Sequence, residues 1–162
     1  MSPTLTLVVV VGSALATGCA SATLDVVRPV PFALDTVTLT IRDESADEMT
    51  PDQMRSLKRA VTRQLVDAGI DVMPSERKGV VRVVGSVQRY DPGIRALRFI
   101  SRWGLGTGAL DTEWEVEDRR SDSLARCEIA GSVSMGTFGG SFDDVQKETG
   151  DALARCLKGE LR

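Results

Sequence analysis

Residues 110–135, LDTEWEVEDRRSDSLARCEIAGSVSM, decide the fold of this chain. Apolar and polar residues alternate from Leu110 to Asp118 and again from Ala125 to Met135, and a polar turn at 119–123 joins the two runs. Alternation with a period of two residues is typical of a strand that buries one face and exposes the other. We therefore predict two half-buried strands whose core-facing side chains are Leu110, Thr112, Trp114, Val116, Ala125, Cys127, Ile129, Gly131 and Val133.

Upstream of this stretch the sequence indicates a strand, a helix and two further strands. The run Thr36–Arg42 alternates as a half-buried strand does, and β segments are expected at 71–73 and 80–90. Between them Thr50 begins a helix, because it can cap the first turn while Pro51 occupies the first helical position and Gln53 completes a capping box. Gly69 follows the last turn of this helix and ends it.

A last helix begins at Ser141, and Asp143 and Asp144 suit the positive end of its dipole. The order of elements is then β-α-β-β-β-β-α. This order predicts an α+β fold in which two helices pack on a mainly antiparallel sheet. The length of 162 residues suggests a single domain.

The composition argues against several classes of function. The chain contains no His, which removes the commonest general base and most zinc sites. The net charge is −3 and the arginines are scattered, so no basic surface for nucleic acid is expected. No catalytic signature is found, and we expect a non-enzymatic protein without cofactor or metal.

The N-terminus predicts export and a lipid anchor. Residues 5–15 carry no charge, and this run is shorter than the roughly twenty residues of a spanning helix, so it fits the apolar core of a signal peptide. The following LATGC, residues 15–19, resembles the lipobox of bacterial lipoproteins. The resemblance implies that residues 1–18 are removed and that acyl chains on Cys19 anchor the protein in a membrane. The alternative is an ordinary signal peptide cleaved near Ala16 or Ala20, with Cys19 incidental.

The residue after Cys19 bears on the location of the protein. It is Ala20 rather than Asp, which by resemblance to proteobacterial sorting favours the periplasmic face of the outer membrane. We expect residues 19–34 to form the lipidated N-terminus and an extended tether, because Pro29 and Pro31 keep the chain extended. Residues 35–162 would then be one periplasmic domain.

Export also bears on the two remaining cysteines, because an exported domain lies in an oxidising compartment. Cys127 belongs to the core-facing set of its strand, and Cys156 shares a helix face with Val145, Thr149 and Ala152. We predict a disulfide between them, worth about 3.6 kcal/mol for a loop of about thirty residues in the chain-entropy model. The alternative is a pair of free buried thiols that behave as small apolar residues.

The middle of the chain carries several short motifs in a fixed order. They are Tyr90-Asp91-Pro92-Gly93, Ala96-Leu97-Arg98, Gly104-Leu105-Gly106-Thr107-Gly108 and the late pair Gly139-Gly140. Together with the lipobox, this series resembles a bacterial lipoprotein family catalogued only as a domain of unknown function. The resemblance covers residues 80–156. It implies the fold and the cellular location but no activity, because none is established for that family.

One segment of this region is a candidate binding surface. Arg95, Arg98 and Arg102 recur at helical spacing, with Trp103 beside them. If the segment is helical, three guanidinium groups line one side and can bind a carboxylate, a phosphate or an anionic head group. The alternative is an ordinary solvated turn whose arginine stems lie along apolar surface.

Two functions from different classes follow. The first is a membrane-anchored envelope component that is not an enzyme and that binds a periplasmic protein or a cell-wall polymer. The alternative is a small-ligand carrier or a hydrolase with a pocket near the glycine-rich loop at 104–108. That loop meets neither the dinucleotide fingerprint nor the P-loop pattern, so we favour the envelope component.

Overall fold

The computed structural model describes residues 20–74, 80–92, 108–118, 120–133 and 141–160. The strands are β1 (Ala20–Arg28), β2 (Thr36–Asp43), β3 (Asp71–Met73), β4 (Val81–Asp91), β5 (Gly108–Glu117) and β6 (Ser123–Val133). The helices are α1 (Pro51–Asp67) and α3 (Phe142–Lys158). From β2 onward the order is the predicted β-α-β-β-β-β-α, so the α+β fold is confirmed.

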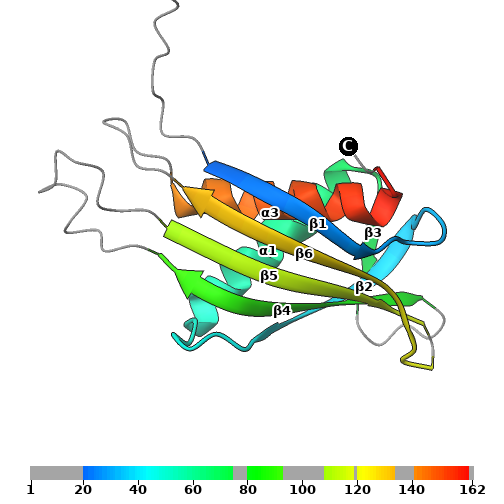
Figure 1. Cartoon of the computed structure of the whole chain (residues 1–162), viewed down its shortest axis with the longest axis horizontal. Coiled ribbons are helices and arrows are strands. Elements are labelled where there is room, and N and C mark those ends of the chain that lie inside the picture. Colours follow the sequence, from blue (N-terminus) through cyan, green and yellow to red (C-terminus); the bar gives the residue numbers. More distant parts are fainter. Residues whose placement is uncertain (1–19, 75–79, 93–107, 119, 134–140, 161–162) are drawn as a thin grey trace, which may run out of the picture.

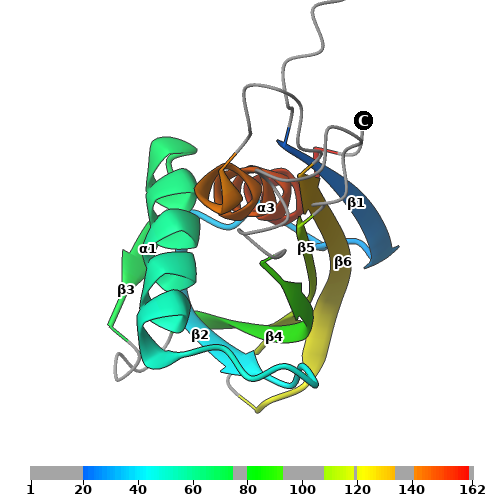
Figure 2. The same cartoon turned by 90° about the vertical axis from the view of Figure 1, so that its left-hand side faces the viewer.

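All six strands belong to one sheet in the order β1-β6-β5-β4-β2-β3 (Figure 1). The pairs β1–β6, β6–β5 and β5–β4 are antiparallel, whereas β2 runs parallel to both β4 and β3. The parallel pair β2–β3 follows from chain connectivity, since α1 lies between these strands and returns the chain to the end where β2 began. The sheet curls, and both helices cover its inner face (Figure 2).

The local signals in the sequence place α1 as predicted. The Thr50 hydroxyl accepts a hydrogen bond from the Gln53 backbone N–H at 3.4 Å, and the Thr50 N–H donates to Gln53 Oε1 at 2.6 Å, which completes the capping box. Three apolar side chains on one face are fully buried: Leu57, Val61 and Leu65. Gly69 has φ +81°, a left-handed conformation that ends the helix. Glycine adopts this conformation readily, whereas residues with a Cβ adopt it at a cost in free energy.

The second helix, α3, approaches its neighbours closely because glycines stand at the contact points. A Cβ added at Gly150 would lie 2.9 Å from the Gln64 Cβ of α1. A Cβ added at Gly131 of β6 would lie 2.7 Å from Val145 Cγ1 of α3. Between the helices, the Ser56 hydroxyl donates to Gln146 Oε1 at 3.0 Å. The helix therefore packs against the sheet on one side and against α1 on the other.

The prediction of a tether is wrong for residues 20–28, which form the edge strand β1. Its register with β6 runs from Ala20 opposite Val133 to Val26 opposite Cys127, and a bulge at Val27 follows. The strand is held because it turns a row of half-buried apolar side chains toward the core. These side chains are Ala20, Ala22, Leu24 and Val26. In the described part of the chain, no helix is long and apolar enough to cross a membrane.

Candidate functional site

The two predicted core cysteines lie opposite each other and form a disulfide. Cys127 is on β6 and Cys156 is on α3, with their Cα atoms 6.7 Å apart and each residue about 1% exposed. The bond joins α3 to β6, the strand next to the edge strand β1. Both residues are at the positions that the strand and helix periodicities predicted.

The remaining predicted site residues lie outside the described residues. They are the lipidation candidate Cys19 and the candidate binding surface of Arg95, Arg98, Arg102 and Trp103. The ALR segment, most of the glycine-rich loop and the late glycine pair also lie outside. Of the motifs that carry the resemblance, the structure describes Tyr90 and Asp91, which end β4, Pro92 after them, and Gly108, which begins β5.

Several elements meet at one end of the molecule, here called the proximal end. β1 begins there at Ala20 opposite Val133, the last residue of β6, and Val133 is also opposite Gly108, the first residue of β5. The last residue of β4, Asp91, is opposite the next residue of β5, and α3 begins beside them at Phe142. Figure 1 shows β1, β5 and α3 beginning at this end of the sheet. The ring of Phe142 meets that of Tyr90 edge-on at a centroid distance of 5.2 Å.

The opposite part of β1 presents an apolar surface. Val27 is 55% exposed, and Phe32, five residues further on, is also 55% exposed. The only other large hydrophobic side chain exposed among the described residues is Val66 on α1. Within the described residues β1 pairs only with β6, so its second edge offers backbone N–H and C=O groups. This edge was not predicted from the sequence, although the consecutive Val26 and Val27 break the alternation and mark an outward-facing apolar residue.

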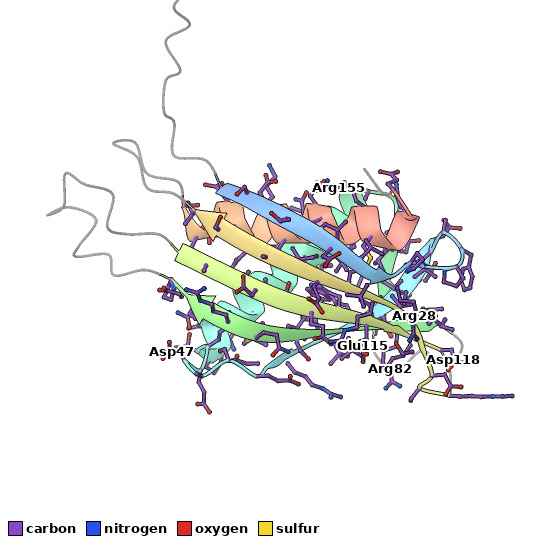
Figure 3. All side chains as sticks on the ribbon, in the orientation of Figure 1. Arg28, Asp47, Arg82, Glu115, Asp118 and Arg155 are labelled. Carbon is purple, nitrogen blue, oxygen red and sulfur yellow. A yellow bond between two sulfur atoms is a disulfide. The ribbon has the colours of Figure 1, made fainter. Side chains whose placement is uncertain are left out.

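The face of the sheet away from the helices is charged. Arg126 on β6 contacts Glu113 of β5 at 2.6 Å and Glu128 at 3.7 Å, and Arg82 of β4 contacts Glu117 at 2.9 Å. Figure 3 shows Arg82 and Glu115 among these outer side chains, at some distance from Asp47.

One row of this face brings like charges together. Glu128 lies opposite Asp25 on one side and opposite Glu113 on the other. Like charges directly opposite each other destabilise a sheet, and Arg126 offsets part of that repulsion. The arrangement favours keeping this face in water.

Asp43, at the end of β2, organises the loop that leads to α1. Its carboxylate accepts hydrogen bonds from the Ser45 hydroxyl at 2.6 Å, from the Ser45 N–H at 3.0 Å and from the Met49 N–H. Burial raises the pKa of Asp43, but these three hydrogen bonds together outweigh burial and hold the pKa below its ordinary value of 3.8. Since all three donors belong to this loop, we interpret the carboxylate as structural.

No family model matches the sequence, and no curated protein matches it. Solved structures do match. A single-residue variant of PelC from Paraburkholderia phytofirmans has 16% identity and a TM-score of 0.61, covering 86% of this chain and 99% of that chain. A second PelC structure has 16% identity and a TM-score of 0.52, covering 89% of this chain and all of that chain. Both are described as dodecamers.

A Xanthomonas campestris protein of the family DUF330 has 13% identity and a TM-score of 0.42, covering 82% of this chain and 83% of that chain. At these identities the likeness of this chain to PelC is one of fold.

Proposed function

We propose that this chain is a lipoprotein of the cell envelope that acts by binding protein rather than by catalysis. Acyl chains on Cys19 hold it at the periplasmic face of the outer membrane, and the domain associates through the free edge of β1. The disulfide between Cys127 and Cys156 supports an oxidising compartment such as the periplasm. The likeness to PelC supports a second copy of the chain as the first partner to test, since PelC is described as a dodecamer.

The observation that carries this proposal is the exposed end of β1. An edge strand with unpaired backbone groups accepts a further strand, and exposed apolar side chains beside it add buried area on association. Val27 and Phe32 provide such side chains. Arg28 fixes this end of the strand, because its Nη1 donates to the Ser123 carbonyl at 2.8 Å, so the edge is already ordered before a partner arrives.

The test compares two valines of similar exposure, 55% for Val27 on the edge strand and 51% for Val66 on α1. We expect the lipidated chain in detergent to be oligomeric by light scattering. Val27→Lys should shift it toward the monomer, because a lysine on an edge strand opposes strand addition. Val66→Lys should leave the mass unchanged. Both variants should keep the thermal stability of the parent within about 0.5 kcal/mol, since both side chains are exposed.

Three outcomes would count against this proposal. A parent chain that is monomeric at all concentrations, in detergent and after crosslinking in membranes, removes self-association. If Val27→Lys and Val66→Lys change the oligomer mass equally, the β1 edge is not the contact surface. A chain that stays out of the membrane fraction removes the lipid anchor.

The segment with Arg95, Arg98, Arg102 and Trp103 is the second surface in this proposal, for an anionic partner such as a protein or a cell-wall polymer. In the sequence it connects Pro92 to Gly108. Replacing the three arginines with glutamate should remove partners from a crosslinking experiment in membranes, and an unchanged set of partners would exclude this surface.

A further inference from the structure

No linker residues separate Cys19, the lipidation candidate, from Ala20, the first residue of β1. Ala20 is opposite Val133 in the sheet, and Cys19 is the residue before it. Consecutive Cα atoms are about 3.8 Å apart, so the Cys19 Cα lies within about 4 Å of a residue that is fixed in the sheet. An acyl-bearing Cys19 therefore has no tether, contrary to the expectation from sequence.

We infer that the domain stands end-on at the membrane, with the proximal end as its base against the lipid head groups and the apolar end of β1 away from them. This inference rests on the lipid anchor of the proposed function. It identifies the end of the domain that faces the bilayer.

The fold makes β1 a rigid connection between anchor and domain. β1 contributes Leu24 and Val26 to the partly buried layer around the core, and its backbone follows β6 from Ala20 to the bulge at Val27. β6 in turn is bonded to α3 through Cys127 and Cys156. The anchor could move away from the domain only if the backbone hydrogen bonds between β1 and β6 broke.

The charge on the outer face argues against the domain lying flat. If that face lay on the bilayer, the row of Asp25, Glu128 and Glu113 would lose part of its hydration at the membrane surface. In the end-on arrangement the same carboxylates remain hydrated. Val27 then lies about 23 Å along the strand from Ala20, at roughly 3.3 Å per residue. The free edge of β1 at Val27 is therefore exposed to the periplasm.

The test measures how close each end of β6 lies to the lipid. The full lipidated chain is reconstituted into phosphatidylcholine vesicles, which carry no net charge, so that electrostatic attraction does not set the orientation. A fluorophore is attached at Ser132→Cys, opposite Ser21 near the base, or at Asp122→Cys beyond the other end of β6. The two positions are about 30 Å apart along the strand.

Lipids with a nitroxide on the head group should strongly quench the label at position 132. The fluorescence of the label at position 122 should be the same in vesicles with and without the nitroxide lipid. Ten Gly/Ser residues inserted between Cys19 and Ala20 supply a flexible tether of about 17 Å, and quenching at 132 should fall while the protein stays on the vesicles.

The outcomes separate the two proposals. Equal quenching at the two positions means that the domain lies flat, and quenching that the inserted linker leaves unchanged means that the anchor does not set the orientation. Either result overturns the end-on arrangement while leaving the lipid anchor intact. If the parent chain fails to float with vesicles and behaves like a Cys19→Ala chain, the anchor and the orientation are both wrong.

Discussion

The helices α1 and α3 have the same length, 17 residues, and the same capping-box start, yet they play different parts in the fold. α1 buries three residues on one face, whereas α3 buries nine around much of its surface. α1 is thus an ordinary amphipathic helix that covers a core, while α3 is enclosed between the sheet and α1. Similar local signals thus begin both helices, but the elements packed around each helix decide how much of its surface is buried.

Two features hold α3 in its enclosed position. Gly131 and Gly150 allow the sheet and α1 to approach it within distances that a Cβ would prevent. The disulfide from Cys156 to Cys127 then prevents the helix from leaving the sheet. α1 contains no cysteine, so no disulfide joins it to the sheet, and its N-terminal connection depends on the hydrogen bonds that Asp43 accepts.

The largest expected effect comes from removing the disulfide with Cys127→Ala and Cys156→Ala together. The cysteines are 29 residues apart, and loss of the bond should cost about 3.6 kcal/mol of unfolding free energy in the chain-entropy model. Urea unfolding followed by circular dichroism measures this loss, and the parent chain in reductant should show a similar loss. If the double variant loses less than about 1 kcal/mol, packing alone holds α3, and the contrast between the helices is smaller than proposed.

A smaller effect is expected from Gly131→Val, which places a side chain where Val145 of α3 packs. Overpacking of this kind costs about 1–3 kcal/mol. Ala130→Val is the matched control, because residue 130 is exposed on the other face of β6 and its substitution should change stability by less than about 0.5 kcal/mol. Equal effects of the two valines in thermal unfolding would show that α3 does not need a glycine at this contact.

The smallest effect concerns the approach to α1. Asp43→Asn should lower stability at neutral pH by about 0.5–1 kcal/mol, because hydrogen bonds to a charged acceptor weaken and solvent screens a partly exposed group. The folded-state pKa is below 3.8, so the contribution of the carboxylate is present above that pH and is lost as pH falls through the lower folded value. The difference between parent and variant should therefore shrink in acid unfolding experiments. A difference that is the same at pH 2 and pH 7 would contradict the assigned role of Asp43.

Much of the architecture could be predicted because its signals are local. The alternation around Trp114, the caps at Thr50 and Ser141, and the stop at Gly69 depend on residues a few positions apart. β1 was not predicted, although its first seven residues alternate apolar with polar ones. A strand and a tether are both extended chains, so only pairing with β6 distinguishes them, and that pairing joins residues more than a hundred positions apart.

The sequence by itself determined where the helices and most strands begin and end, which faces are apolar, and which two cysteines lie on core-facing positions. These follow from side-chain periodicity and from capping chemistry, which act over one or two turns of chain. Only the tertiary structure decided the order of strands, the parallel pairing of β2, the enclosure of α3 and the place of Ala20 at the end of the sheet. Such features depend on contacts between distant segments, whose free energies no short stretch of sequence contains.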